Sequence, residues 1–252
     1  MEEQGAGNKK KAICVILAYN CANLLEHTYE RIPAGSVDRI VLIDDGSKDD
    51  TLLEAKRLGI EYYTHKNLGY GGNVKYSLRK CIELGAEYMI ELHGDGQYDP
   101  TVIPMALAKA REGYDIIVGS RFTDLKQPLK DGMSFARYFA NIGLSFIARV
   151  VLGLPLSEFH SGFRIYTKHL AETVILDNAS DGHLFGFDII AQAHFCGLPI
   201  GEVPIRCDYK EAHTSISIPN SVIYAFQMLN VAMLYRLAKM GIVTKRFGCS
   251  GK

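Results

Sequence analysis

The sequence has no excess of charge of either sign. Of its 252 residues, 28 are Lys or Arg and 28 are Asp or Glu, so the formal net charge is zero. Proteins that bind nucleic acids usually carry a basic excess, so we expect no nucleic-acid partner, although a small basic pocket stays compatible with this balance. Because 48% of the residues are hydrophobic, the chain can bury the core of one large domain.

The cysteines lack the spacing of a zinc site, because no Cys-x-x-Cys pair is present. Several lie in apolar runs, where a free thiol behaves as a small hydrophobic group. We therefore expect reduced thiols in a cytoplasmic protein. The six are Cys14, Cys21, Cys81, Cys196, Cys207 and Cys249.

Long apolar runs are also missing. Residues 1–11 form a polar tail without the apolar core of a signal peptide. No uninterrupted apolar stretch reaches the ~18 residues of a spanning helix. Two segments, 134–152 and 220–240, have apolar faces and basic flanks, as helices lying on a membrane surface do. The same faces suit a core helix or a dimer surface, so peripheral membrane contact and homo-oligomerisation both remain open.

Strands and helices alternate through the first half of the chain. This pattern predicts an α/β fold with a mostly parallel sheet and helices on both faces. No linker interrupts residues 12–217, so we expect one domain there, followed by an amphipathic helix and tail at 218–252. The expected strands are 12–18, 39–43, 60–64, 87–92, 115–118 and 200–205, with a further short strand after a polar turn at 160–166. The expected helices are 23–31, 50–58, 73–84, 101–111, 134–152, 185–196 and 220–240.

The most informative motif, His93 to Pro100, follows the fourth expected strand. Asp95 offers a carboxylate and Gln97 an amide oxygen on the same side of an extended segment. Oxygen ligands suit Mg²⁺ or Mn²⁺, which often bridge substrate phosphates. The glycines Gly94 and Gly96 allow a phosphate to approach the backbone. A simple hairpin turn at Asp95-Gly96 is the alternative.

Other polar clusters also follow strands, and parallel strands bring such clusters to one edge of the sheet. Asp44 and Asp45 can hold a ribose hydroxyl or a base N–H, whereas Asp49 and Asp50 are better explained as helix caps. The glycine-rich segment 67–73 leads into a helix, so its N–H groups can bind an anion, although a structural turn explains it equally well.

These blocks, in their order, resemble the family-2 glycosyltransferases of the GT-A fold, and most of all the polyprenyl-phosphate sugar synthases. The resemblance implies transfer of a hexose from a UDP- or GDP-sugar to an acceptor such as a polyprenyl phosphate. It covers about 13–217 and is carried by Ala18-Tyr19-Asn20, Asp44-Asp45-Gly46-Ser47, Asp95-Gly96-Gln97, Gly119-Ser120-Arg121, Ser161-Gly162-Phe163-Arg164 and Gly201-Glu202-Val203-Pro204.

The resemblance also implies roles for individual residues. Asp95 becomes the metal-binding carboxylate, with Gln97 as a further ligand of Mg²⁺ or Mn²⁺. Lys210 and Ser215, in a late loop, would clamp the donor diphosphate. The implied donor-binding residues are Leu17, Ala18, Tyr19, Asn20, Asp44, Asp45 and Ser215, and the glycine-rich segments described above add Gly71, Lys75 and Gly94 as donor-binding candidates. The implied acceptor-binding residues are Ser120, Arg121 and Arg164, where Arg121 also counts as catalytic and Arg164 has a structural alternative.

Three positions depart from the family pattern. His93 stands where the first Asp of Asp-x-Asp is usual, and imidazole is a softer ligand than carboxylate. Lys210 replaces an Arg and loses the bidentate fork. Asp188 replaces a helix Glu. These changes leave the predicted reaction class unaltered. The nucleotide base, the sugar and the acceptor are not predicted by the sequence.

The expected mechanism is an inverting displacement in which a metal on Asp95 bridges the donor diphosphate and Lys210 adds charge. A phosphate acceptor needs no general base, whereas a hydroxyl acceptor needs one, for which Asp188 is the candidate. A sugar nucleotidyltransferase is a second possibility, but residues 13–20 lack its basic glycine-rich loop. A non-catalytic binding module is a third, and the intact Asp95 and Gln97 argue against it.

Overall fold

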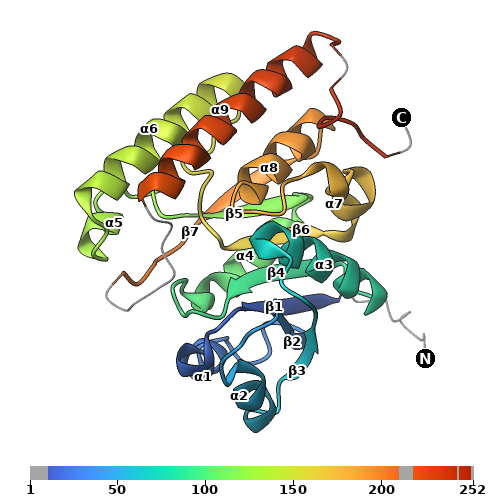
Figure 1. Ribbon diagram of the computed structural model, residues 1–252, viewed down its shortest axis with the longest axis vertical. Coiled ribbons are helices and arrows are strands. Elements are labelled where there is room, and N and C mark those ends of the chain that lie inside the picture. Colours follow the sequence, from blue (N-terminus) through green and yellow to red (C-terminus); the bar gives the residue numbers. More distant parts are fainter. Residues whose placement is uncertain (1–10, 210–217, 243, 251–252) are drawn as a thin grey trace, which may run out of the picture.

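The computed structural model describes residues 11–209, 218–242 and 244–250. These residues form one seven-stranded sheet with helices on both faces (Figure 1). The strand order is β3-β2-β1-β4-β6-β5-β7. The strands are β1 (Ala12–Ala18), β2 (Arg39–Asp44), β3 (Glu61–Thr64), β4 (Tyr88–His93), β5 (Ile116–Ser120), β6 (Arg164–Thr167) and β7 (Ile200–Pro204).

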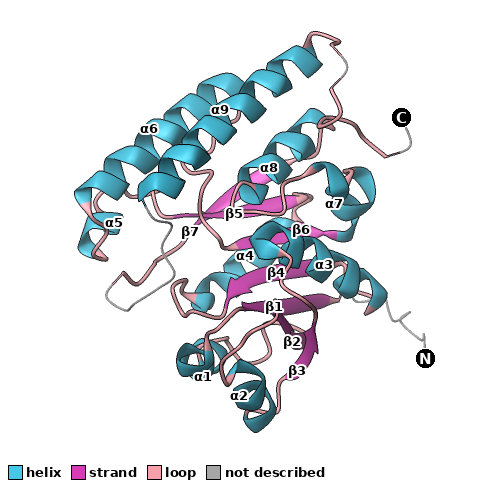
Figure 2. Ribbon diagram, viewed as in Figure 1, coloured by secondary structure: helices cyan, strands magenta, loops and turns pink. Residues whose placement is uncertain are grey.

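The helices cover the two faces of the sheet (Figure 2). Successive side chains of a strand point to opposite faces, so Val15 and Ile16 of the fully buried β1 enter two different cores. The helices are α1 (Ala22–Glu30), α2 (Thr51–Arg57), α3 (Gly69–Glu83), α4 (Ile103–Arg111), α5 (Gln127–Lys130), α6 (Phe135–Leu152), α7 (Lys168–Thr173), α8 (Phe185–Phe195) and α9 (Ile218–Lys239), with 3₁₀ turns at Pro100–Val102 and Leu176–Asn178.

The mostly parallel α/β architecture expected from the sequence is confirmed. The exception is β6, which runs antiparallel between β4 and β5, with Arg164 opposite both Glu91 and Val118. Since an antiparallel strand begins where its parallel neighbours end, the segment before β6 lies at the carboxyl edge of β4 and β5. The fold therefore brings residues 157–163 to the edge that carries Asp95 and Ser120.

The element boundaries agree with the sequence except at three places. Helix α3 begins at Gly69 instead of residue 73, so the glycine-rich segment is the first turn of a helix and not a loop. Short helices α5 and α7 were not expected. Each has at most six residues, which is too short for a periodic apolar pattern to mark it.

Helices α6 and α9 pack side by side along one end of the molecule (Figure 1). The inner face of α9 is buried through Met228, Val231 and Tyr235. Within the described ranges, α6 alone has the length and apolar composition to cross a membrane, and 17% of it is buried in the structure. Its two arginines, Arg137 and Arg149, interrupt the apolar sequence.

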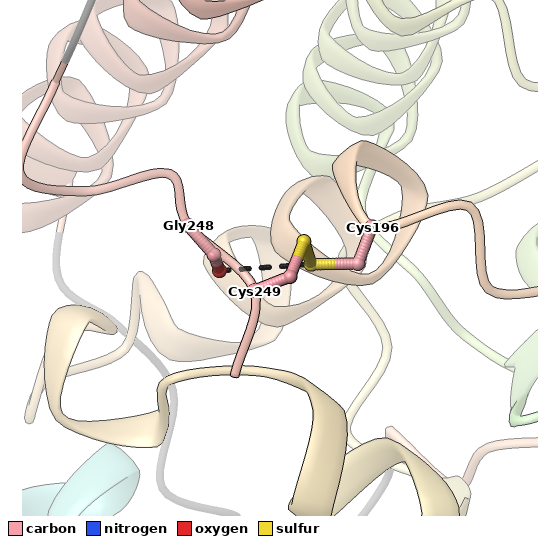
Figure 3. The surroundings of a disulfide bond; sticks show 3 residues. All are labelled: Cys196, Gly248 and Cys249. Carbon is pink, nitrogen blue, oxygen red and sulfur yellow. Dashed lines mark hydrogen bonds between the residues drawn. A yellow bond between two sulfur atoms is a disulfide. The ribbon is translucent and has the colours of Figure 1, made fainter. Parts of the chain in front are cut away.

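The expectation that all thiols are reduced is wrong for one pair. Cys196, at the end of α8, forms a disulfide with Cys249 near the C-terminus (Figure 3). The two residues are 53 positions apart, so no local spacing in the sequence could predict the bond. The other four cysteines are free and buried, as their apolar surroundings predict.

Candidate active site

The ends of β1 and β2 are joined by the polar side chains that follow them. Asn20 adopts the left-handed backbone conformation, with φ of 51°. Its side-chain oxygen accepts a hydrogen bond of 2.7 Å from the Lys48 N–H, and its own N–H donates to Ser47 Oγ over 2.8 Å. Tyr19, next to it, leaves its ring exposed. The two clusters therefore meet as the sequence predicts.

Asp44 and Asp45 are both buried and bind backbone groups of neighbouring loops. Asp44 accepts hydrogen bonds from the N–H groups of Gly46 and Ser47, each at 3.2 Å. Asp45 accepts from Leu68 N–H at 2.6 Å and from Gly69 N–H at 3.1 Å. Burial raises the pKa of Asp45 above its usual range. These carboxylates brace the strand ends, and their contact with a base or ribose stays a prediction.

The first turn of α3 is fixed by protein contacts. A side chain at Gly71 would come within 2.3 Å of the Ser180 carbonyl oxygen. The Lys75 ammonium is buried and lies 2.5 Å from Asp181, and it also donates to the Ala179 carbonyl over 3.1 Å. The donor contacts implied for Gly71 and Lys75 stay predictions, since close packing already accounts for the glycine and internal pairing for the lysine.

The Asp95 loop follows β4 and is held on both sides. Gly94 donates its N–H to the Leu17 carbonyl over 2.9 Å, at the end of β1. Asp95 Oδ1 accepts from the Gln97 N–H at 3.1 Å. The Gln97 carbonyl in turn accepts from Asp208 N–H at 2.9 Å. The loop thus connects the end of β1 with the segment that leads to Lys210.

The oxygen groups of this loop fit a divalent cation shared with a substrate. In residues 11–209, 218–242 and 244–250, no group of three or more His, Cys, Asp or Glu side chains is arranged to hold a metal alone. Mg²⁺ and Mn²⁺ sites of nucleotide enzymes commonly use one or two carboxylates, waters and the substrate phosphates. Asp95 with Gln97 matches that donor set, so a cation here would require the donor diphosphate.

A buried charge network lies behind the Asp95 loop. Glu91 is fully buried and accepts hydrogen bonds from Tyr70 at 2.6 Å and Tyr166 at 2.7 Å. Burial opposes its ionisation, but the hydrogen bond from His93 and the charge of Arg164 outweigh burial and lower the pKa of Glu91. His93 Nε2 lies 3.4 Å from Glu91 Oε1, a contact that could not be predicted from the sequence.

Arg164 is buried in the same network. Its guanidinium donates to Tyr70 Oη over 3.2 Å and to the Phe159 carbonyl over 3.3 Å. A side chain at Gly186 would lie within 2.5 Å of that guanidinium. These contacts match the structural alternative raised for Arg164, and its contact with an acceptor stays a prediction.

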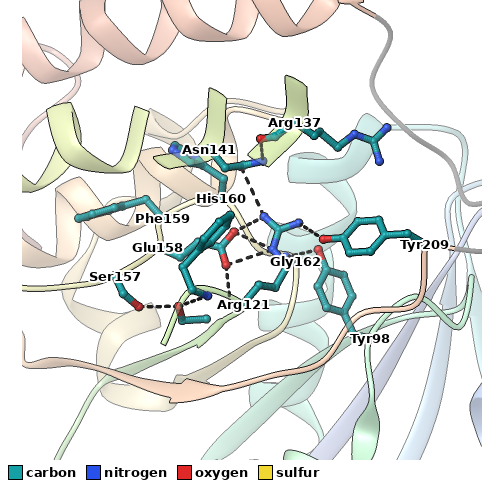
Figure 4. Close-up of polar contacts among 12 residues, drawn as sticks. Tyr98, Arg121, Arg137, Asn141, Ser157, Glu158, Phe159, His160, Gly162 and Tyr209 are labelled. Atoms are coloured by element: carbon teal, nitrogen blue, oxygen red, sulfur yellow. Dashed lines mark hydrogen bonds and ion pairs between the residues drawn. The ribbon is translucent and has the colours of Figure 1, made fainter. Parts of the chain in front are cut away.

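Arg121 lies at the end of β5 in a buried ion pair with Glu158 (Figure 4). Its Nε donates to Glu158 Oε1 over 2.8 Å and its backbone N–H donates to Oε2 over 2.7 Å. Nη1 donates to the Tyr209 hydroxyl over 2.9 Å. The arginine thus links β5, the segment before β6 and the residue preceding Lys210, while its position is set by Glu158.

Ser120 and the segment 157–162 complete this side of the site. Ser120 Oγ lies 2.6 Å from Ser157 Oγ, which donates to Glu202 over 2.8 Å. Tyr98, in the Asp95 loop, accepts a hydrogen bond of 2.7 Å from the Gly162 N–H (Figure 4). The predicted metal loop is therefore joined to the 157–162 segment, which also contacts Ser120 and Arg121 through Ser157 and Glu158.

Asp188, the predicted base, is fully buried in the first turn of α8. Both carboxylate oxygens lie 2.5 Å from Arg246 Nη1, and Oδ2 also accepts the Ser180 N–H at 3.0 Å. Burial raises the pKa of Asp188, and Arg246 offsets that effect in part. A role as a base stays a prediction, and the present contacts are those of a structural carboxylate.

Four site residues were missed by sequence reasoning: Glu91, Glu158, Tyr209 and Arg246. Glu91 and Glu158 lie in segments that read as apolar strand and loop. A buried Arg usually needs a carboxylate partner, and this rule could have pointed to Glu91 and Glu158. It can be applied only once the burial of Arg121 and Arg164 is known. The predicted residues Lys210 and Ser215 lie outside the described residues.

Residues 13–175, more than half of the chain, match the sequence model of glycosyl transferase family 2. The chain belongs to this family. The match includes the Asp44-Asp45, Asp95 and Arg121 blocks, so the resemblance inferred from those blocks is confirmed, and the protein is a glycosyltransferase.

Three relatives match most of the chain. An uncharacterized protein of Methanocaldococcus jannaschii is 31% identical over 88% of this chain and 90% of its own length. The UDP-N-acetylglucosamine–dolichyl-phosphate N-acetylglucosaminyltransferase of Methanococcus voltae is 26% identical, over 86% and 95%. The undecaprenyl-phosphate mannosyltransferase of Micrococcus luteus is 27% identical, over 77% and 82%.

A solved structure confirms the GT-A fold of this glycosyltransferase. Glucosyl-3-phosphoglycerate synthase from Mycobacterium tuberculosis, in complex with Mn²⁺, UDP and glucosyl-3-phosphoglycerate, aligns with a TM-score of 0.66 at 17% identity. The alignment covers 94% of this chain and 82% of the synthase. At this identity the likeness concerns the fold and not the substrate.

Proposed function

We propose that this glycosyltransferase moves a hexose or N-acetylhexosamine from a nucleoside-diphosphate sugar to a polyprenyl phosphate, with inversion at the anomeric carbon. Two relatives whose names specify polyprenyl phosphates, dolichyl and undecaprenyl, support this acceptor class. The single structural observation that carries the proposal is the linkage of the Asp95 loop to the Arg121 side of the site through Tyr98 and Gly162.

The donor is proposed to lie across the carboxyl edge of β1, β2 and β4. Tyr19 and Asn20 then flank the nucleoside, near the Asp44 and Asp45 loops, and Asp95 and Gln97 face the diphosphate. A divalent cation bound by Asp95 and Gln97 supplies charge that stabilises the departing nucleoside diphosphate. Mn²⁺ in the complex of the mycobacterial synthase supports a divalent ion. Lys210 and Ser215 are proposed to close on the same diphosphate.

The acceptor is proposed to approach from the Arg121 side. Glu158 orients the guanidinium of Arg121, whose contact with Tyr209 places it beside the segment that leads to Lys210. A lipid phosphate is already an anion, so it can attack the anomeric carbon without a base. The burial of Asp188 under Arg246 favours such an acceptor, because a hydroxyl acceptor would require a carboxylate with a free oxygen.

A peripheral membrane position is proposed through the outer faces of α6 and α9. Exposed Phe135, Phe139 and Phe146 follow one side of α6, and Phe226 and Met233 follow one side of α9. Their spacings of four and seven residues place them on a common helical face. We commit to an anionic lipid surface as the occupant because basic residues lie within or next to these helices in the sequence, namely Lys126, Lys130, Arg149, Arg236 and Lys239.

The experiment that tests the proposed function compares Asp95→Asn with Asp99→Asn. Asp99 lies in the same loop but caps the following 3₁₀ turn through Thr101. With Mn²⁺, a nucleotide sugar and a short polyprenyl phosphate, we expect Asp95→Asn to lose at least about a hundredfold in kcat/KM. Asp99→Asn should stay within a few-fold of the parent. Equal rates for the parent and Asp95→Asn contradict the metal role.

A further inference from the structure

The C-terminal segment 244–250 is fastened to the body of the protein at three points. The ring of Phe247 is buried between Phe195 and Tyr235, with centroid distances of 5.4 and 5.7 Å. Arg246 reaches Asp188. Cys249 is bonded to Cys196 at the end of α8 (Figure 3). A backbone hydrogen bond of 2.7 Å from Ser250 N–H to the Thr173 carbonyl adds to these contacts.

The contact between Arg246 and Asp188 reaches the donor side of the site through Ser180. Asp188 Oδ2 accepts the Ser180 N–H, and the Ser180 carbonyl packs against Gly71 in the first turn of α3. Next along the chain, the Asp181 backbone carbonyl accepts the Gly72 N–H at 3.1 Å. That same turn of α3 begins with the Gly69 N–H that binds Asp45. Contacts therefore run without a break from the C-terminal segment to the predicted nucleoside side.

The cysteines of this fastening differ from the others in accessibility. Cys196 and Cys249 are both partly exposed to solvent. The four free cysteines are buried, and burial raises the pKa of Cys14, Cys21 and Cys81, which makes their thiols unreactive. Among these six cysteines, only the bonded pair can therefore exchange readily with thiols in solution.

We propose that Arg246 is a positioning residue for the donor-side loop 179–182, held in place by a thiol–disulfide latch between Cys196 and Cys249. This inference rests on the proposed function, since it assigns the loop to donor binding. A dithiol reductant opens the latch by supplying two electrons and two protons. The S–S bond breaks, two thiols form and the reductant becomes a disulfide. A disulfide oxidant reverses the step.

Opening the latch affects donor binding and not the displacement itself. Once the tail is released, Asp188 is a buried carboxylate that has lost its ion-pair partner Arg246, so the 179–182 loop loses part of its support. Weaker donor binding with unchanged chemistry raises KM and leaves kcat nearly constant. We expect the reduced protein to have a donor KM about tenfold higher than the oxidised protein, with kcat within about twofold.

The experiment uses the full-length protein with five matched variants. Cys249→Ser removes the latch, Arg246→Ala removes the cation, and Arg246→Lys restores part of it. Lys245→Ala is the control, because Lys245 is the exposed basic neighbour of Arg246. We expect Cys249→Ser and Arg246→Ala each to raise the donor KM. Reductant should cause no further rise in the donor KM of Cys249→Ser. Arg246→Lys should recover part of the affinity, and Lys245→Ala should match the parent. The fifth variant, Asp188→Asn, should remove the effect of Arg246→Ala in the double mutant.

A second readout separates failure of the latch from failure of the proposed function. Two measurements need no substrate. One is the rate at which iodoacetamide labels Cys196 at increasing dithiothreitol concentrations, and the other is Tm under the same conditions. The latch requires loss of the bond on reduction, a Tm about 5 °C lower or more, and the same low Tm in Cys249→Ser. If Cys249→Ser matches the oxidised parent in both Tm and donor KM, the latch is overturned. If Tm responds as expected but no nucleotide sugar is turned over, the proposed function fails and the fastening stands.

Discussion

Glu158 is the residue on which the placement of Arg121 depends. Its carboxylate is fully buried and receives the backbone N–H and the guanidinium of Arg121. A buried ion pair contributes little net stability compared with an apolar pair, but removing one partner leaves a buried charge without compensation. Removing Glu158 should therefore lower the free energy of unfolding strongly, whereas removing the carboxylate of an exposed ion pair should lower it only slightly.

We expect Glu158→Gln to lower the free energy of unfolding by about 3–5 kcal/mol. Glu172→Gln is the control, because the Glu172–Lys168 pair is exposed and contributes at most about 1 kcal/mol. Urea unfolding followed by circular dichroism measures both. A loss of less than about 1 kcal/mol in Glu158→Gln would contradict the ion pair as the anchor of Arg121.

His160 couples the stability of the fold to pH. Burial, with the nearby charges of Arg121 and Arg164, lowers the pKa of His160 to about 3. The unfolded chain takes up this proton near pH 6.5, whereas the folded chain does not, so the stability present above pH 6.5 falls as the pH drops below it. Between pH 6.5 and about 4, this residue costs about 1.4 kcal/mol per pH unit.

The matched variant is His160→Asn, whose amide can keep the hydrogen bond that Nδ1 forms with Tyr224. We expect the parent to lose stability relative to the variant as the pH falls from 6.5 to 5, and the two to run parallel above pH 7. Unfolding free energies measured across this range test the difference. Parallel curves down to pH 5 mean that His160 titrates normally.

At the scale of single residues, sequence reasoning located polar groups but not their partners. Asp45 and Asp95 stand out because they follow strands. Glu158 does not stand out, because its role depends on an arginine 37 positions away. Arg246 and Asp188 are 58 positions apart, so their pairing depends on how the C-terminal segment folds back. Long-range pairing carries no local pattern, so these residues could be found only in the structure.

At the scale of elements, the strands were predicted well because their burial on both faces produces continuous apolar runs. The glycine-rich start of α3 was not, because glycines are unfavourable inside helices and suggested a loop. The structure explains the exception, since Gly71 packs where a side chain would lie 2.3 Å from the Ser180 carbonyl oxygen. Tertiary packing therefore outweighs helix propensity at this turn.

Two helix glycines provide a direct test of this explanation. We expect Gly71→Ala to lower the free energy of unfolding by at least about 1 kcal/mol, since backbone must move to admit the methyl group. Gly143 in α6 has open space around it, so Gly143→Ala should raise stability by about 0.5–1 kcal/mol through helix propensity. Thermal unfolding of the two variants suffices, and changes of the same sign in both contradict the packing explanation.

At the scale of the whole molecule, helices α6 and α9 lie at one end, away from α2 (Figure 1). Phe139 and Phe226 are 67% and 70% exposed there. An apolar face with nearby cations binds an anionic bilayer through burial of apolar surface and through electrostatic attraction. Because salt screens the electrostatic attraction, binding should weaken as the salt concentration rises. The sequence predicted the apolar faces but could not decide between a lipid surface, a core and a second copy of the chain.

We expect Phe139→Glu and Phe226→Glu to abolish co-sedimentation with vesicles containing phosphatidylglycerol. Leu53→Glu is the control, since Leu53 is 65% exposed on α2, and it should bind as the parent does. Light scattering of the same proteins reports mass. If the parent is a dimer that Phe139→Glu dissociates, while vesicle binding is the same in all variants, the face is a protein interface.

The measurement that tests the central claim most directly is sugar transfer by the purified protein. UDP- and GDP-sugars, radiolabelled in the sugar, are incubated one at a time with a polyprenyl phosphate and Mn²⁺, with and without EDTA. We expect one donor to give a labelled lipid, with loss of the product in EDTA and in Asp95→Asn. Label appearing only as free sugar or in water-soluble products, or equal transfer in EDTA, would contradict a metal-dependent polyprenyl-phosphate glycosyltransferase.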